Sequence, residues 1–402
     1  MSRTNTPLAR HRLHAVPVCA IGLFAVARIA AAADEPAVRF TTSLFDGRSL
    51  DGWTIENDCQ ADVEDGLLVL KSGNGWLRSD LTYQDFVLHV EWKAVKSADY
   101  DSGIYIRTLP GGKPFPSTAY QVNLLEGKEG NIGNLPGAAS TGHIKPGEWN
   151  KFDITVLGER VALSINGRPA YDVQGLKQPV GYVGLQCEVP KGGEFQFRNL
   201  RITEIGYRSL FDGSDLTGWQ GAGEPAEKCW HVKDHLLQCT GAAGPWLRSK
   251  EEFADFDLRL DYQVSPGGNS GVYVRVPADG NHHREDDQAP PAGFEVQVLD
   301  DDAPQHKDLK DYQYSGSVYD IAGATQHVSK PPGRWNTLEI NARGQAITVT
   351  HNGVIVVDLD PVKFPLIHLR QARGFLGLQN HSTLVKFRNL RIGPPLPRGA
   401  RE

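Results

Sequence analysis

Two short stretches of alternating sequence carry the side chains best suited to chemistry. Residues 294–299 read FEVQVL, so that three apolar residues alternate with Glu295 and Gln297. A period of two is typical of a half-buried strand and predicts that the carboxylate and the amide project from one sheet surface. Residues 120–125 read YQVNLL and carry Gln121 and Asn123 at the matching places. A carboxylate can accept a proton whereas an amide can only hydrogen-bond, which predicts one catalytic stretch and one limited to binding or support.

The two stretches can be compared because the chain contains one unit written twice. Shared motifs occur in the same order in both halves: LFDG (44–47 and 210–213), WLRS (76–79 and 246–249), SGxYxR (102–107 and 270–275), GxWN (147–150 and 333–336) and FRNLRI (197–202 and 387–392). A constant order of many motifs indicates a tandem duplication.

Each half consists of short alternating segments bounded by Gly, Pro, Asn and Asp. Asn166-Gly167 and Asn352-Gly353 lie between apolar alternations and are strong signals for hairpin turns. This pattern predicts an all-β chain of two jelly-roll β-sandwiches, over residues 34–205 and 206–395, with a short tail at 396–402. Helix should be scarce, and any substantial helix should lie in the long insert, at 277–291 or 303–312.

The first 33 residues have the pattern of a secretory signal peptide. A basic start precedes an apolar run over residues 15–27, and Ala31-Ala32-Ala33 offers a small-residue cleavage site. The apolar run is too short to span a bilayer, so we expect a secreted or periplasmic protein without an integral membrane segment. Removal of these residues takes the formal charge from −6 to −10 over 369 residues, and an acidic chain without a basic cluster is a poor nucleic-acid binder.

Four cysteines follow the signal segment: Cys59, Cys187, Cys229 and Cys239. Cys229 and Cys239 flank two strand-like pieces placed symmetrically about a turn at Asp234-His235. In an exported protein this placement allows a disulfide across the hairpin, while buried free thiols fit the pattern equally well. We expect Cys229 and Cys239 to form this disulfide.

In the second half, three alternating segments present polar residues that would share one face if the segments were neighbours in one sheet. These residues are Arg259 and Asp261, Tyr273 and Arg275, and Glu295 and Gln297. A solvated face with cross-strand ion pairs, such as Arg275 with Glu295, is the structural alternative. The polar loop with His282-His283 and residues 285–287, and the turn at 300–302, contain metal-ligand types but also fit a solvated loop and a plain turn.

Taken together, the motifs resemble the 3-keto-disaccharide hydrolase family, over nearly all of the mature chain and in both halves. The resemblance rests on FDG with LxGW, SGxYxR, the EVQ of 295–297 with Asp300, GxWN, GLQ and FRNLRI. It implies a concanavalin-like jelly roll that acts on glycosides oxidised at C3, by a lyase and hydratase route. A ketone at C3 acidifies the proton at C2, and the glycosidic oxygen at C1 lies beta to the resulting enolate and can leave.

Such a reaction needs a base near C2 and cationic or metal stabilisation of the enolate oxygen. The resemblance implies Glu295 as the base, with Arg275 and Asp261 as further catalytic residues, and a divalent metal ion as a helper. The expected substrate-binding residues are Tyr273, Gln297, Trp246, Arg248, Gln379, His381 and Asn269. The first copy departs from this set, with Gln121 for Glu295, Asn123 for Gln297 and Asp101 for Asn269.

The leading hypothesis is therefore an exported carbohydrate-active enzyme whose substrate is an oxidised di- or oligosaccharide glycoside. The second copy would be catalytic, and the first would bind sugar or support the fold. The alternative is a pair of lectin-like carbohydrate-binding modules without catalysis, because one fold hosts many functions. A structural or protein-interaction module is a third hypothesis that rests on the fold alone.

Overall fold

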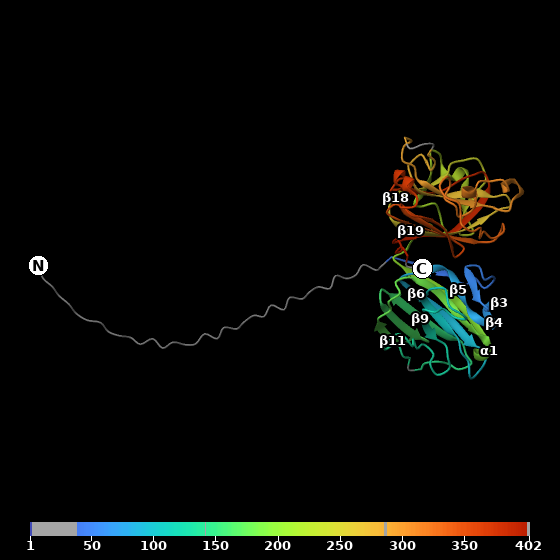
Figure 1. The fold of residues 1–402 in the computed structure, drawn as a ribbon, viewed down its shortest axis with the longest axis vertical. Helices are drawn as coiled ribbons and strands as arrows, with labels where there is room; N and C mark the ends of the chain where they lie inside the picture. The colour runs from blue at the N-terminus through green and yellow to red at the C-terminus, as the bar shows by residue number, and fades with distance from the viewer. Residues whose placement is uncertain (2–37, 141, 285–287, 400–402) are drawn as a thin grey trace. The chain divides into compact units, whose positions relative to one another are not determined.

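The structure is a computed structural model that describes Met1 and residues 38–140, 142–284 and 288–399. Figure 1 shows the first repeat in blue to green and the second in yellow to red. The expected signal peptide, residues 1–33, lies outside the described residues except for Met1. No helix in the described part of the chain has the length and apolar character needed to cross a membrane.

The first repeat folds into two antiparallel sheets. The larger sheet has the order β11-β10-β9-β6-β13-β4-β3, with β1 also paired to β13. Its strands are β1 (Arg39–Ser43), β3 (Gln60–Glu64), β4 (Leu67–Ser72), β6 (Phe86–Ala94), β9 (Asn150–Leu157), β10 (Arg160–Ile165), β11 (Arg168–Gln174) and β13 (Phe195–Ile205). The smaller sheet has the order β2 (Trp53–Asn57), β5 (Asn74–Tyr83), β12 (Gly181–Glu188), β7 (Gly103–Thr108) and β8 (Tyr120–Asn123).

The second repeat has the same two-sheet arrangement. The larger sheet has the order β16 (Trp230–Lys233), β17 (Leu236–Thr240), β26 (Leu384–Gly393), β19 (Phe256–Val264), β22 (Asn336–Arg343), β23 (Ala346–His351) and β24 (Val354–Leu359), and β14 (Arg208–Ser209) pairs with β26. The smaller sheet has the order β15 (Trp219–Gly221), β18 (Leu247–Phe253), β25 (Gly374–Leu378), β20 (Asn269–Val276) and β21 (Phe294–Leu299).

The expected fold class, two tandem all-β sandwiches, is confirmed. Helical structure in the described residues is limited to α1 (Val189–Gly192) and four 3₁₀ turns, η1 (Ala226–Lys228), η2 (Pro304–His306), η3 (Asp311–Gln313) and η4 (Pro365–Leu369). Two of these turns fall in or next to the insert at 303–312, as expected. The described part of the insert at 277–291 contains no helix.

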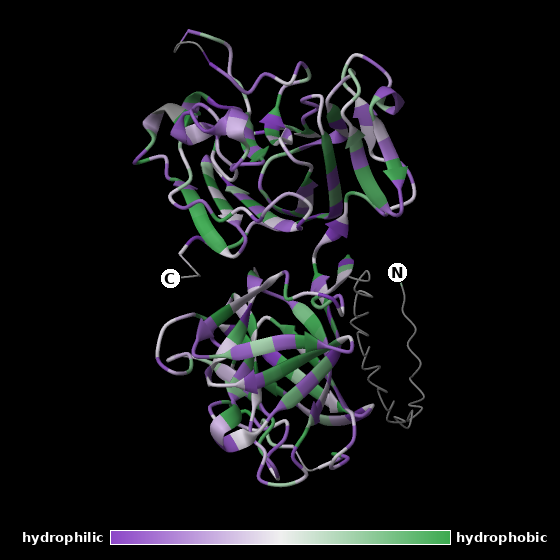
Figure 2. Ribbon diagram, turned by 90° about the vertical axis from the view of Figure 1, so that its right-hand side faces the viewer, coloured by the Kyte–Doolittle hydropathy of each residue, from purple (hydrophilic) through white to green (hydrophobic). Residues whose placement is uncertain are grey.

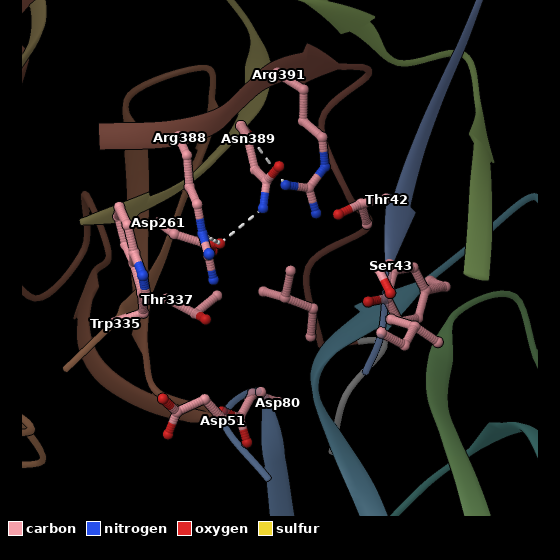
Figure 3. A pocket seen from close by; sticks show the side chains of 14 residues that line it. Thr42, Ser43, Asp51, Asp80, Asp261, Trp335, Thr337, Arg388, Asn389 and Arg391 are labelled. Atoms are coloured by element: carbon pink, nitrogen blue, oxygen red, sulfur yellow. Dashed lines mark hydrogen bonds and ion pairs between the residues drawn. The ribbon is translucent and has the colours of Figure 1, made fainter. Parts of the chain in front are cut away.

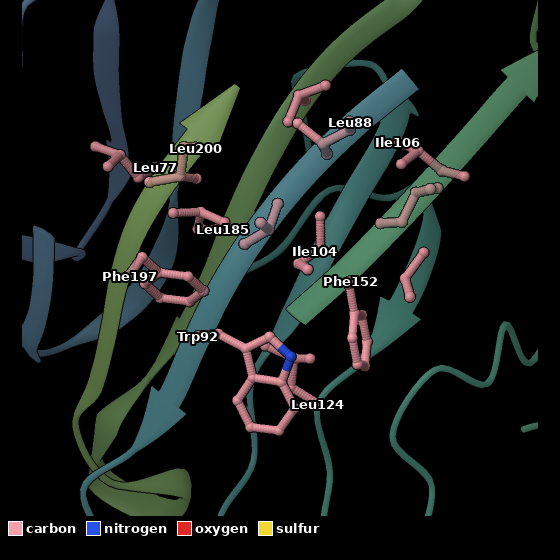
Figure 4. Packing of buried hydrophobic residues seen from close by; sticks show 14 of the residues in the cluster. Leu77, Leu88, Trp92, Ile104, Ile106, Leu124, Phe152, Leu185, Phe197 and Leu200 are labelled. Atoms are coloured by element: carbon pink, nitrogen blue, oxygen red, sulfur yellow. The ribbon is translucent and has the colours of Figure 1, made fainter. Parts of the chain in front are cut away.

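Each repeat has its own hydrophobic core between its two sheets. Strand β6 shows why the core forms between the sheets, because every second side chain along it is buried. Figure 2 shows strands banded in green and purple, which is the same alternation of hydrophobic and hydrophilic residues. Figure 4 shows Leu88 and Trp92 of β6 and Phe152 of the neighbouring strand β9 gathered against Ile104 of β7, which belongs to the opposite sheet. Burial of each such side chain stabilises the fold by about 1.5–3 kcal/mol, so the alternation holds the sheets face to face.

The expected disulfide between Cys229 and Cys239 is wrong, because all four described cysteines are free and buried. In the hairpin, Cys239 pairs with Trp230 rather than with Cys229. The thiol of Cys229 donates to the carbonyl of Pro245 at 3.3 Å, and that of Cys239 donates to Oδ1 of Asn380 at 3.2 Å. Burial raises the pKa of the Cys229 thiol and raises that of Cys239 to about 11, which keeps both protonated at neutral pH.

We therefore expect Cys59, Cys187, Cys229 and Cys239 to resist alkylation in the native protein. Each should take up one alkyl group after denaturation without a reductant, because no disulfide protects it. Mass spectrometry of the digested protein measures this directly. A pair of peptides linked through Cys229 and Cys239 would contradict the structure.

Candidate active site in the second repeat

Glu295 lies on β21, the last strand in the order of the small sheet of the second repeat. On β21 it pairs with Tyr273 of the neighbouring strand β20, and only 1% of its surface is exposed. Its Oε2 lies 2.9 Å from Nε2 of His282, while its Oε1 makes no hydrogen bond with the described residues. A Cβ atom at Gly271 would lie 2.0 Å from Oε1, so the glycine leaves the space that the carboxylate occupies.

The long insert between β20 and β22 supplies the second wall of the site. Residues 316–319 run beside β21, where Gly316 N donates to Gln297 O at 2.9 Å and Tyr319 N donates to Glu295 O at 2.9 Å. Arg370 fixes the loop that carries His282, since its Nη1 donates to the carbonyls of His282 at 2.6 Å and of Gly293 at 2.8 Å. The imidazole is thus tied to the start of the strand that carries Glu295.

The hydrogen bonds of His282 define where its protons lie. Its Nδ1 is 3.1 Å from the carbonyl of Gly280, which can only accept, so Nδ1 is the donor. Its Nε2 faces the Glu295 carboxylate, and this contact also requires a proton between the two atoms. Burial lowers the pKa of His282, but the hydrogen bond and the charge of Glu295 outweigh burial and raise it above its usual value of 6.5. The ring also stacks on Tyr273 with centroids 4.9 Å apart.

A cavity of 360 Å³ opens over this pair. It is lined by Asn269, His282, His283, Glu295, Gln297, His306, Leu309, Gln313, Tyr319, Gln379 and His381. The amide of Gln379 donates to the Tyr273 hydroxyl at 3.2 Å and that of Gln297 to Asn269 Oδ1 at 3.5 Å, whereas the amide oxygens of both glutamines make no hydrogen bond with described residues. Together with Glu295 Oε1 they form a set of acceptors suited to a hydroxyl-rich ligand.

A metal ion has no ready ligand set in the described part of the chain. No group of three or more His, Cys, Asp or Glu side chains in those residues is arranged to hold one. In the turn at 300–302, Asp300 accepts from Gly267 N at 2.7 Å and Asp301 from Ser315 N at 2.9 Å, so both carboxylates already cap backbone groups.

The structure brings together most of the expected binding residues. Asn269, Gln297, Gln379 and His381 line the cavity beside Glu295, and Tyr273 lies under His282. Trp246 packs edge-on against Tyr273, 5.2 Å between centroids, and supports that ring from outside the cavity lining. Arg248 does not line the cavity, because its Nη1 donates to the carbonyl of Ala278 at 2.9 Å and its guanidinium lies over Phe375.

The expectation that Arg275 acts beside Glu295 is wrong. A bulge in β20 interrupts the alternation after Tyr273, and Arg275 has a positive φ of 53°. Its side chain is fully buried and donates at 2.6 Å to the carbonyl of Ala254, in the turn from β18 to β19, and at 2.6 Å to that of Gly344, in the turn between β22 and β23. Arg107 of the first repeat makes the matching bonds, so this arginine joins the two sheets of each sandwich.

The expectation that Asp261 belongs to the same site is also wrong, because β19 lies in the larger sheet rather than beside β20 and β21. Figure 3 shows Asp261 in a different pocket, which Asp51 and Asp80 also line. Its Oδ2 accepts from Arg388 Nε at 3.0 Å and from Asn389 Nδ2 at 2.8 Å. The carboxylate is held by its own sheet and does not face Glu295.

The corresponding surface of the first repeat satisfies its polar groups internally. Gln121 donates to Oε1 of Gln186, whose amide donates to Glu188 at 2.9 Å. The side-chain oxygen of Asn123 accepts from Leu125 N at 2.7 Å. The acceptors that stay unpaired in the second repeat therefore have paired counterparts in the first.

The sequence pattern did not predict the roles of His282 and of Arg370, which follows η4 outside the insert, or the presence of the insert residues His306, Leu309, Gln313 and Tyr319 in the site. These residues lie in loops and 3₁₀ turns, where side-chain periodicity does not indicate direction. The available signal was the extra length of the second copy between its SGxYxR and GxWN motifs, with histidines in it. An insert over a functional strand is a common place for binding residues.

Replacing Arg275 tests its structural role. We expect Arg275→Met to lower the free energy of unfolding by about 3 kcal/mol or more, because buried carbonyls lose charged donors. Denaturant unfolding measures the change, with Arg248→Met as the matched control at a less buried arginine. An unchanged midpoint would show that Arg275 does not join the sheets.

The His282–Glu295 pair predicts a pH dependence. Since the folded pKa of His282 is raised, the pair adds stability that is full below pH 6.5 and is lost as the pH rises through the folded pKa. We expect a titration midpoint above 6.5 for His282 by NMR, and a lower midpoint in Glu295→Gln, where the charge is gone. Exposed His231 serves as the control, and a midpoint unaffected by Glu295→Gln would refute the pair.

Known proteins and protein-family models were compared with this sequence, and several match it. The sequence model of the 3-keto-alpha-glucoside-1,2-lyase-like domain matches residues 41–203 and again 206–393. A 3-keto-disaccharide hydrolase of Bacteroides thetaiotaomicron is 27% identical over 244 residues, which cover 50% of this chain and 83% of the relative.

Solved structures are also similar to this chain. A Parabacteroides distasonis protein, provisionally described as a glycosyl hydrolase, is 28% identical and aligns over 47% of this chain and 98% of its own, with a TM-score of 0.39. A carbohydrate binding module from Bacillus subtilis is 17% identical over 37% of this chain and 94% of its own, with a TM-score of 0.29. The two matches of the domain model span most of the chain, which therefore belongs to the 3-keto-alpha-glucoside-1,2-lyase-like family and contains two tandem copies of its domain.

Proposed function

We propose that the second repeat cleaves glycosides whose sugar carries a ketone at C3, by elimination across C2 and C1 followed by hydration. Family membership supports this proposal, as does the name of the Bacteroides relative, a 3-keto-disaccharide hydrolase. The pattern of residues 1–33 supports export, so that the substrate would be an oxidised di- or oligosaccharide met outside the cytoplasm.

One observation carries the proposal: a buried carboxylate with an unpaired oxygen at a cavity lined by hydrogen-bond acceptors. Glu295 is almost fully buried, yet its Oε1 makes no hydrogen bond with described residues. A buried carboxylate oxygen without a hydrogen bond destabilises the fold unless a ligand donates a hydrogen bond to it. A general base next to bound sugar hydroxyls is an arrangement that meets this condition.

In the proposed first half-reaction, Glu295 Oε1 takes the proton from C2. The electron pair moves into the C2–C3 bond and onto the ketone oxygen, and the resulting enolate expels the glycosidic oxygen from C1. The Glu295 Oε2 atom and the Gly280 carbonyl each hold a proton on one ring nitrogen of His282. The protonated ring places a positive charge next to the reacting centre. His282 thus supplies the positive charge beside the enolate that the sequence pattern predicts for Arg275.

The first repeat would support the fold or bind sugar without turnover. Its Gln121 cannot accept a proton, and its amides are already engaged with Gln186 and Glu188. The segment between β7 and β8, residues 109–119, corresponds to the loop that carries His282 and contains no histidine.

We expect Glu295→Gln in the full chain to reduce turnover of a 3-keto-glucoside by about 10²- to 10⁴-fold, the usual loss when a general base is removed. Binding of the same compound should persist, because the amide keeps the shape and the hydrogen bonds of the side chain. Product release measured by NMR, together with calorimetric binding, separates the two effects. Gln121→Ala, at the matching place of the first repeat, should leave the rate unchanged.

Turnover by Glu295→Gln at the wild-type rate would remove Glu295 from the mechanism. A wild-type protein that binds 3-keto-glucosides but never converts them would instead be a lectin-like module, and the enzymatic proposal would fail. A parallel assay with a chelator tests the role of a divalent ion.

A further inference from the structure

We propose that Nε2 of His306 is the acid that protonates the departing glycosidic oxygen and the base that activates water in the hydration step. This inference rests on the proposed function, since it assigns the proton that leaves with the aglycone. Glu295 can remove the proton from C2, but a simple sugar alkoxide is a poor leaving group and needs a proton of its own.

The environment of His306 leaves one ring nitrogen for chemistry. Its Nδ1 is 2.8 Å from the backbone carbonyl of Asp300, which only accepts, so Nδ1 carries a hydrogen. Its Nε2 makes no hydrogen bond with the residues that the structure describes, and His306 lines the same cavity as Glu295 with 9% of its surface exposed. Nε2 can therefore hold or release a proton without breaking the bond that orients the ring.

The ring of His306 is held by several contacts. The Asp300 carbonyl also accepts from Ala303 N at 3.2 Å, and the Asp300 carboxylate is fixed by Gly267 N at 2.7 Å. The hydroxyl of Tyr314 donates to the carbonyl of His306 at 3.2 Å. Turn η2, which follows β21 after a few residues, thus places His306 at a constant position relative to the strand of Glu295.

The other histidines of the cavity fit this role less well. Nε2 of His282 is committed to Glu295. His283 has a half-exposed side chain and an ion pair with Asp320 at 2.8 Å, and His381 lies exposed at the rim. His306 is thus the buried imidazole whose second nitrogen stays unengaged among the described cavity residues.

Glu295 and His306 together account for every proton that is transferred in the reaction. In the elimination, Glu295 gains the C2 proton, the C1–O bond breaks, and its electron pair stays on the oxygen, which takes the Nε2 proton of His306. The products are the alcohol and an enone with a double bond between C1 and C2. Glu295 is then protonated and His306 neutral.

These are the states that hydration needs. Neutral His306 takes a proton from the water that adds to C1, the position beta to the ketone. Electrons return to C2, which takes the proton from Glu295, and both residues regain their starting forms. The sum is hydrolysis of the keto-glycoside, with no added oxidant or reductant.

The test compares two leaving groups on the full-length protein. Substrates are 3-keto-glucosides with a methyl aglycone, which needs protonation, and with a 4-nitrophenyl aglycone, which departs readily as an anion. In His306→Asn the amide nitrogen can still donate to the Asp300 carbonyl, but nothing replaces Nε2. We expect a loss of about 10²-fold or more on the methyl substrate and less than about tenfold on the nitrophenyl substrate in the elimination step.

His306→Gln, which places its amide nearer to the Nε2 position, should show the same selective loss and gives a second variant if the first is unstable. His231→Gln, at an exposed site on β16, is the control and should affect neither substrate. Equal losses on both substrates in the folded variants would overturn the role of His306. Failure of the wild-type protein to convert either substrate would instead overturn the proposed function itself.

Discussion

The site in the second repeat depends on a carboxylate that is buried against an imidazole. A buried charge is tolerated when a partner of opposite sign compensates it, and removing that partner costs several kcal/mol. Glu295 is compensated by His282, which stands on an insert rather than on the sheet. The bonds that tie the insert to β21, from Arg370, Gly316 and Tyr319, are therefore conditions for an ionised base and not mere loop packing.

The duplication shows which parts of the domain are scaffold and which are site. Both repeats keep the same cores and the same buried arginine that joins their sheets, Arg107 and Arg275. The outward polar face of the small sheet has diverged, because core packing does not constrain it. In the first repeat its amides bond to one another, whereas in the second they leave acceptors open to a ligand.

The sequence was sufficient for the fold and for part of the site, for identifiable reasons. Alternation along residues 294–299 predicts the strand and the shared direction of Glu295 and Gln297, and the structure agrees. Alternation could not predict the bulge that turns Arg275 into the core, since one extra residue reverses the side-chain direction. Nor does it give the order of strands or their division between two sheets, so alternation alone could not separate Asp261 on β19 from Glu295 on β21. His282 and His306 lie in irregular segments, where only tertiary contacts fix direction.

The central claim is that a proton leaves C2 before the glycosidic bond breaks. The enone with a double bond between C1 and C2, supplied to the protein in heavy water, tests it most directly, with NMR of the 3-keto-glucose formed at early times. The account predicts that the protein hydrates this enone at least as fast as it converts the keto-glucoside, and that one deuterium enters C2, because Glu295 then takes its proton from the solvent. An enone that the protein leaves unchanged while it converts the keto-glucoside would mean that the bond is hydrolysed without elimination, and it would contradict the assignment of Glu295 as the base.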